Sequence, residues 1–188
     1  MIIDSSFSGD YKLTVQDEIK NGLEVVYFPG GSSTGGTDGV IVRVSEIEKK
    51  GWQGIFAFGD ITKKGVSGIF GMPDSNKFCV VSRGNGFIVS ANCPREWDSV
   101  ECMPVMDVKT SVEHKIIIFA SYTHLVAYGE KGIRWTTVRL SFDGLTITGL
   151  AEDIIQGRYY DIRSGRLEDF KVSLKDGSVL DSNGSIVF

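Results

Sequence analysis

Six Asn-Gly or Asp-Gly dipeptides are spread along the chain, and they constrain its fold more than any other feature. Asn, Asp and Gly tolerate the positive φ angles that the central positions of tight hairpin turns require. Several of the dipeptides separate short apolar or alternating runs, which is a strong sequence signal for β-hairpins. They are Asn21-Gly22, Asp38-Gly39, Asn85-Gly86, Asp143-Gly144, Asp176-Gly177 and Asn183-Gly184.

The runs between these turns have the pattern of β-strands. Apolar and polar residues alternate over 138–142 and over 170–174, which places one set inward and the other outward. The run 116–119 is apolar throughout, as expected of a strand buried on both faces. The sequence therefore predicts an all-β fold, an antiparallel meander of hairpins.

One to three very short helices are also expected, each with a capping residue before it or a glycine after it. None would exceed two turns, so none would frame the fold. The candidate segments are 15–21 after Thr14, 46–50 after Ser45, and 151–156 before Gly157.

The length of 188 residues predicts a single β domain spanning 1–188. The segment 30–37 consists of Gly, Ser and Thr and has the composition of a flexible loop. A domain boundary there is not expected, because the residues before it are too few to build a core.

Two stretches of the chain share an order of strands and a tryptophan. The runs 79–82 and 87–89 are followed by Trp97, and the runs 118–121 and 125–127 are followed by Trp135. Trp52 precedes Trp97 by a similar interval. Recurrence near 40–45 residues with several strands per unit is typical of β-propeller blades.

The segment 69–150 resembles a propeller-type blade repeat, of a kind seen in uncharacterised bacterial proteins. The resemblance lies mainly in LVAYG at 125–129, GIRW at 132–135 and FDGL at 142–145. The Trp-Asp ending and Gly-His start of the common WD repeat are missing. The resemblance implies a small or incomplete propeller, and a β-sandwich built from similar strands remains the alternative.

The bulk composition excludes several classes of function. The net charge of −4 provides no basic stripe for nucleic acid. No apolar run approaches the length of a membrane span. The N-terminal residues lack the basic region and apolar core of a signal peptide, so none is expected. The three cysteines have no disulfide-framework spacing, so a cytoplasmic location is expected. No phosphate-binding motif points to a cofactor, and none is expected.

Metal and nucleophile chemistry have few candidates. His114 and His124 are the two histidines of the chain, and both fall in turn-like segments, so no metal site is expected. A Cys–His pair could form between Cys93 or Cys102 and His124, although packed thiols are the simpler interpretation.

Paired carboxylates would support a hydrolase acting on a sugar-like substrate. The candidates are Asp98 with Glu101, Glu152 with Asp153, Asp161, and Glu168 with Asp169.

Large cationic and aromatic side chains gather in the C-terminal third of the chain. Arg, Trp and Tyr are the residues that most often dominate binding energies at protein interfaces. The candidate binding residues are Arg134, Trp135, Arg139, Tyr159, Tyr160 and Arg163, with Arg166 nearby. Trp135 could equally pack inside its own repeat.

Three hypotheses of function follow. The first is a non-catalytic protein-interaction or ligand-binding domain, for which another bacterial protein is the expected kind of partner. The second is the carboxylate hydrolase, and the third is a small immunity or inhibitor protein, which the acidic composition suggests.

Overall fold

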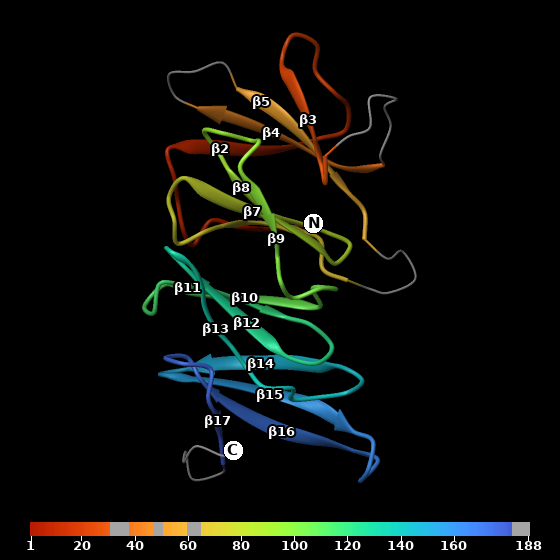
Figure 1. Cartoon of the computed structure of the whole chain (residues 1–188), viewed down its shortest axis with the longest axis vertical. Coiled ribbons are helices and arrows are strands. Elements are labelled where there is room, and N and C mark those ends of the chain that lie inside the picture. Colours follow the sequence, from red (N-terminus) through yellow and green to blue (C-terminus); the bar gives the residue numbers. More distant parts are fainter. Residues whose placement is uncertain (31–37, 47–50, 60–64, 182–188) are drawn as a thin grey trace. The chain divides into compact units, whose positions relative to one another are not determined.

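The computed structural model describes residues 1–30, 38–46, 51–59 and 65–181. It divides into two compact units, Met1–Val100 and Glu101–Phe188, and each unit contains two β-sheets (Figure 1). The described residues form strands, turns and loops without any helix. The predicted all-β fold is therefore confirmed, whereas the expectation of a single domain stays a prediction.

The first sheet of unit 1 has the strand order β1-β6-β7-β8-β9. Strands β6 to β9 form an antiparallel meander, and β1 adds to the edge in parallel with β6. The strands are β1 (Ile2–Asp4), β6 (Gly68–Gly71), β7 (Lys77–Ser82), β8 (Asn85–Ser90) and β9 (Trp97–Ser99).

The second sheet of unit 1 has the order β2-β4-β5-β3, so its strands do not follow the chain. Strand β3 runs parallel to β5, and the other pairs are antiparallel. The two parallel edge strands of unit 1 are a departure from the predicted antiparallel meander. The strands are β2 (Tyr11–Gln16), β3 (Glu24–Phe28), β4 (Gly39–Glu46) and β5 (Trp52–Ala57).

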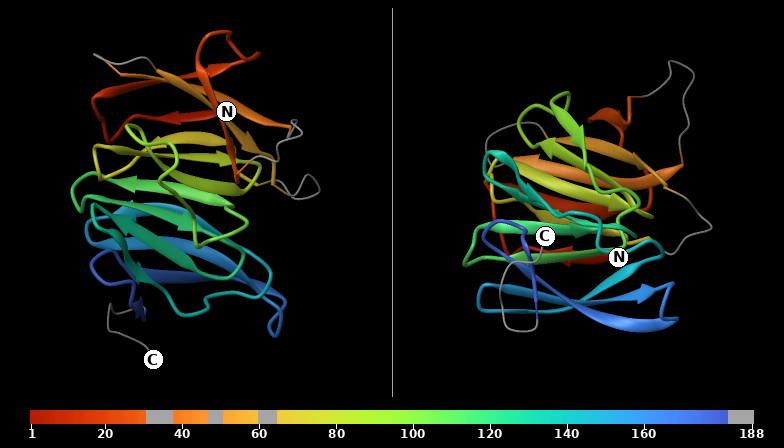
Figure 2. Two further views of the ribbon diagram at one scale, coloured as in Figure 1. Left: turned by 45° about the horizontal axis from the view of Figure 1, so that its top comes forward. Right: turned by 60° about the horizontal axis from the view of Figure 1, so that its bottom comes forward.

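Unit 2 follows the predicted meander throughout. Its two sheets, β10-β11-β12-β13 and β14-β15-β16-β17, each contain four antiparallel strands in chain order, which is the connectivity of a propeller blade (Figure 2). The strands are β10 (Asp107–Ser111), β11 (Ile116–Ala120), β12 (Leu125–Gly129), β13 (Gly132–Thr136), β14 (Leu145–Ala151), β15 (Ile154–Asp161), β16 (Arg166–Ser173) and β17 (Val179–Leu180).

The predicted repeat corresponds to equivalent strands. The run 79–82 lies in β7 and 118–120 in β11, and each is the second antiparallel strand of its meander. Trp97 and Trp135 then lie in β9 and β13, the last strands of the two meanders. Trp52 does not fit this series, because it begins β5, an internal strand of its sheet.

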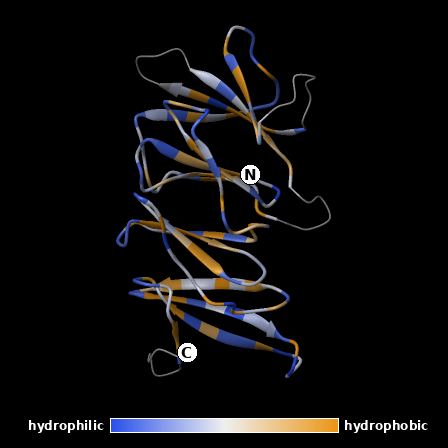
Figure 3. Ribbon diagram, viewed as in Figure 1, coloured by the Kyte–Doolittle hydropathy of each residue, from blue (hydrophilic) through white to orange (hydrophobic). Residues whose placement is uncertain are grey.

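Each unit has its own core, and alternation along the strands supplies it. In unit 1, Val42 and Phe56 from the β2–β5 sheet meet Phe78 and Val89 from the other sheet. In unit 2, Ile118 of β11 packs in one cluster with residues of β14, β15 and β16. All five residues of β11 are fully buried, as predicted from their continuous apolar run, and Figure 3 shows this strand as hydrophobic along its length.

Buried indoles bind the paired sheets of each unit. Trp52 donates its Nε1–H to the carbonyl of Ala91 at 2.8 Å, and Trp135 donates to the carbonyl of Leu174 at 2.9 Å. We call these two hydrogen bonds the indole clamps. Gly177 packs against the Trp135 ring with φ of +75°, where a Cβ would approach the ring carbon Cε3 to 2.7 Å.

The predicted helices are wrong where the structure describes them. The first predicted helix, at 15–21, overlaps strand β2 (11–16), whose backbone groups pair with β4. Further along the same segment, the peptide groups of Lys20 bond to the side chain of buried Gln53. Residues 151–156 form the β14–β15 hairpin, with Glu152 at φ of +50°. Glu46 ends β4, while 47–50 lie outside the described residues.

Turn positions also differ from the prediction in places. The β7–β8 turn uses Arg83 and Gly84, both with positive φ, and Asn85-Gly86 already belongs to β8. Gly39 likewise begins β4. Gly144 and Gly177 have the expected positive φ. Residues 31–37 of the predicted loop at 30–37, and the turn at Asn183-Gly184, lie outside the described residues.

Replacing Trp135 with phenylalanine should destabilise the protein. The change removes the indole N–H and leaves the buried Leu174 carbonyl without its donor, at a cost of about 1–3 kcal/mol in the free energy of unfolding. Urea denaturation followed by circular dichroism measures this difference. Trp97→Phe is the matched control, since Trp97 is only half-buried; equal losses in both variants would contradict a special role for the clamp.

Candidate functional site

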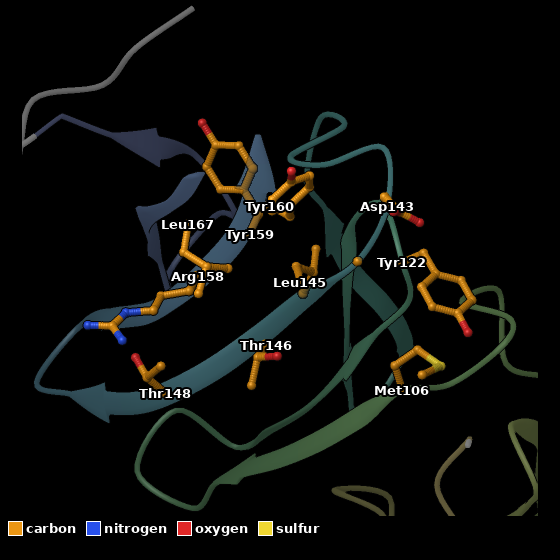
Figure 4. Close-up of a pocket in the computed structure, with 11 residues that line it drawn as sticks. Met106, Tyr122, Asp143, Leu145, Thr146, Thr148, Arg158, Tyr159, Tyr160 and Leu167 are labelled. Carbon is orange, nitrogen blue, oxygen red and sulfur yellow. The ribbon is translucent and has the colours of Figure 1, made fainter. Parts of the chain in front are cut away.

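A pocket of unit 2 with a volume of about 530 Å³ lies beside strand β14 (Figure 4). Its volume falls in the range of small-ligand sites. Side chains of strands β14, β15 and β16 line it together with side chains from loops next to β10 and β11, and most of them are apolar or aromatic. They are Met106, Tyr122, Asp143, Leu145, Thr146, Thr148, Arg158, Tyr159, Tyr160 and Leu167, together with Gly144. We call this the β14 pocket.

The turn before β14 fixes one end of this pocket. The Ser141 hydroxyl donates to the carbonyl of Gly144 at 2.8 Å and accepts the backbone N–H of Asp143 at 3.2 Å. Gly144 has φ of +114°, which favours glycine, and its N–H donates to the carbonyl of Tyr122 at 3.1 Å. The turn therefore holds Asp143 next to Tyr122 and leaves its carboxylate exposed.

The β15–β16 hairpin forms the other side of the pocket. Tyr160 lies directly opposite Leu167 in the ladder, and these side chains are 43% and 66% exposed. Such exposure of adjacent large apolar groups is a feature of binding surfaces. Tyr159, one position earlier, packs against the unit 2 core because neighbouring residues of a strand face opposite ways.

The charged groups of this hairpin are bonded among themselves. Arg158 Nε donates to Asp169 Oδ1 at 2.9 Å, although both side chains are mostly exposed. The Asp161 carboxylate accepts the backbone N–H groups of Arg163 and Ser164 in the hairpin turn. These hydrogen bonds, chiefly that from Arg163, hold the pKa of Asp161 below its usual range.

The structure separates the binding residues expected from the sequence. Tyr159 and Tyr160 line the β14 pocket, whereas Arg134 lines a different pocket and donates to the carbonyl of His114 at 2.9 Å. Trp135 is only 7% exposed and is occupied by its indole clamp.

The remaining arginines of that set lie on exposed segments of unit 2. The Arg139 guanidinium stands 5.2 Å from the ring centre of Phe142, just before the turn at Asp143. Arg163 lies in the β15–β16 turn, and Arg166 begins β16 opposite Asp161. Sequence reasoning missed Tyr122, Asp143 and Leu167, and only the Asp143-Gly144 turn signal pointed near them.

Both histidines occupy turns in which a serine three residues earlier contacts the ring. Ser111 Oγ lies 2.9 Å from His114 Nδ1, and Ser121 Oγ lies 3.1 Å from His124 Nδ1. The Ser-x-x-His spacing at 111–114 and 121–124 is the sequence signal for these turns. The side chain of His114 is 16% exposed.

His114 also reaches a residue of the next sheet. Its Nε2 lies 2.7 Å from Asp153 Oδ1, so Ser111, His114 and Asp153 form a continuous hydrogen-bonded chain. Ser111 is 9% exposed, and its hydroxyl also accepts the backbone N–H of His114, as a turn-capping serine does. This geometry bridges two hairpin turns and offers a substrate little access to the hydroxyl.

The carboxylates expected for a hydrolase are not gathered in the β14 pocket, where Asp143 is the one acidic residue among the described lining residues. Asp153 bonds to His114, Asp161 caps its own turn and Asp169 pairs with Arg158. Glu152 lies in the β14–β15 turn, Glu168 faces Tyr159 across the ladder, and Asp98 and Glu101 are exposed.

The Cys102 thiol contacts the backbone near His124 and not its ring. Its Sγ donates to the carbonyl of Phe119 at 3.4 Å and lies 3.8 Å from the carbonyl of His124. Burial raises the pKa of Cys102 to about 12, and burial likewise raises the pKa of Cys79 far above its usual value. Cys93 is half-buried, and all three thiols are free.

Two further observations bear on function. Among the residues that the structure describes, no group of three or more His, Cys, Asp or Glu side chains could hold a metal ion. Within the same ranges, no helix is long and apolar enough to span a bilayer.

The chain matches no family model and no curated protein. Among solved structures, it is similar to the N-terminal domain of Nup159, with 12% sequence identity and a TM-score of 0.38. The similarity covers 92% of this chain and 49% of that domain, so the chain spans about half of the domain's length. A similarity at this level carries no argument about fold or function.

Iodoacetamide at pH 8 should modify Cys93 in the native protein and leave Cys79 and Cys102 intact. The raised pKa values keep both buried thiols protonated at this pH, and the thiolate is the reactive form. Mass spectrometry of peptides after timed labelling measures the three sites. Unfolding in urea should expose all of them, and native labelling of Cys102 as fast as Cys93 would contradict the buried placement.

Proposed function

We propose that this protein is a non-catalytic interaction module that binds another protein through the β14 pocket and the exposed apolar side chains around it. The observation that carries this proposal is the apolar, tyrosine-rich lining of an open pocket beside exposed Tyr160 and Leu167. Aromatic anchors in a partly enclosed pocket are typical of the energetic centre of protein interfaces.

The surroundings of the pocket extend this apolar surface. Phe142 precedes the pocket residue Asp143 and is 69% exposed, and Ile162 follows Tyr160 closely and is 60% exposed. Exposed apolar groups scattered singly need no explanation, but several around one pocket favour a docking surface.

The charges of the β15–β16 hairpin support binding more than catalysis. Arg158 and Asp169 neutralise each other at the surface, and Asp161 is engaged in its turn. Glycoside hydrolysis requires two carboxyl groups that face each other across a cleft. The described lining of the pocket contains one carboxylate, that of Asp143. The hydrolase hypothesis thus has less support than the interaction module.

An immunity or inhibitor protein would be one kind of interaction module, and the acidic composition is its sole support. The bacterial source and cytoplasmic location expected from the sequence also stay predictions.

The substitution Leu167→Asp should weaken binding of the partner protein. The substitution places a charge in the apolar rim of the pocket and should weaken binding by about tenfold or more, as expected for an interface anchor. Affinity capture from a lysate of the source organism, with the captured proteins quantified by mass spectrometry, measures the loss.

Val112→Asp is the matched control for this experiment. Val112 is 58% exposed, lies in the β10–β11 turn and does not line the pocket. A protein captured by the wild type and by Val112→Asp, but lost from Leu167→Asp, supports the proposal. Capture of the same proteins by all three chains, or of none by the wild type, would refute it.

A further inference from the structure

We infer that the β14 pocket receives an arginine or lysine side chain of its partner, next to an apolar side chain that packs on Tyr160 and Leu167. The inference rests on the proposed function and adds the chemistry of the partner segment. Its basis is the Asp143 carboxylate, which no cation in the pocket neutralises, together with the tyrosines of the pocket and the exposed apolar side chains at its other end.

The carboxylate of Asp143 is the charged group of the pocket that has no oppositely charged partner among the described lining residues. Arg158 is the sole cation among the described lining residues, and its guanidinium is already paired with Asp169. Among the described residues, no side chain bonds to the Asp143 carboxylate, whose residue is exposed. The pocket therefore offers one uncompensated negative charge, which complements a cation.

The carboxylates of two other aspartates in unit 2 accept hydrogen bonds within their own turns. Asp161 accepts from Arg163 and Ser164, and Asp176 accepts from the backbone and hydroxyl of Ser178. In the turn at 141–144 the Ser141 hydroxyl takes this capping role. The Asp143 carboxylate is thus not needed to hold its turn and is free for a ligand.

An aromatic ring lies beside the turn that carries this carboxylate. The Tyr122 ring lies beside the turn, 3.6 Å from the position that a Cβ on Gly144 would occupy. Figure 4 shows Asp143 and Tyr122 at one end of the pocket and Leu167 toward the other, with Tyr160 between them in this view. A carboxylate in a pocket that is also lined by tyrosines suits an ammonium or guanidinium group, which can gain from both charge attraction and cation–π contact.

The apolar end of the pocket defines the neighbouring side chain. Tyr160 and Leu167 face each other across the β15–β16 ladder and are both exposed. They would bury an aliphatic side chain, while the cation lies against Asp143. Strand β14 itself carries a register shift between Ile147 and Gly149, and bulges of this kind oppose the addition of a further strand. The partner is therefore expected to contribute side chains more than backbone hydrogen bonds.

Blocked pentapeptides that differ only at the middle position test the inference. The middle residue is arginine, citrulline or glutamate, and leucine flanks it on both sides; citrulline keeps the shape of arginine without the charge. Titration of the ¹⁵N-labelled full chain, followed by amide chemical shifts, locates and quantifies binding. The arginine peptide should shift the amides of Gly144 and Leu167 and should bind about fivefold more tightly than the citrulline peptide.

Asp143→Asn should abolish that preference, since it removes the charge and keeps the side-chain shape and the Ser141 cap. The preference of the wild type should also shrink at high salt, because an exposed charge pair is screened. Glu113→Gln is the control, as it removes one negative charge from a different pocket and should leave the preference unchanged.

Three results would overturn the inference: equal binding of the arginine and citrulline peptides, an unchanged preference in Asp143→Asn, or no binding of any peptide. Partner capture separates this failure from that of the proposed function. If Leu167→Asp loses the partner and Asp143→Asn retains it at full strength, the interaction module stands and the cation site does not.

Discussion

The indole clamps are the interactions on which each two-sheet unit depends. Trp135 of β13 donates to Leu174, just after β16, and Trp52 of β5 donates to Ala91, just after β8. A buried indole N–H without an acceptor would cost about 1–3 kcal/mol. Each tryptophan can therefore fill the core only when the second sheet presents its carbonyl at one position, which fixes how the two sheets of a unit pack.

The β14 pocket depends on this fixed packing. Tyr122 and Met106 come from segments of the first sheet of unit 2, while Leu145, Tyr160 and Leu167 come from the second. The Trp135 clamp and the His114–Asp153 contact both join these two sheets. Preorganisation of this kind lowers the entropic cost of binding, because the walls of the pocket are already in place.

Some features were readable from the sequence because they are local. The continuous apolar run 116–119 lies in β11 and the alternating run 170–174 reaches through the end of β16, and the match of 79–82 and 118–121 identified equivalent strands. The alternating run 138–142 was wrong as a strand, since it lies between β13 and β14 and leaves Val138 and Phe142 exposed. Three hydrogen bonds that join the two sheets of a unit, Trp52–Ala91, His114–Asp153 and Trp135–Leu174, each connect residues 39 positions apart. The short helices failed because strand pairing and the buried Gln53 amide competed successfully with local capping signals.

The sequence by itself determined that this chain forms antiparallel hairpins, because side-chain alternation and glycine turns act within a few residues. Tertiary structure decided that β1 and β3 add in parallel at sheet edges and that Trp135 is a clamp and not a contact for partners. It also decided the candidate site, because Tyr122, Asp143 and Leu167 line one pocket only in the folded chain. Their proximity follows from the packing of one sheet on another, and no local pattern encodes that packing.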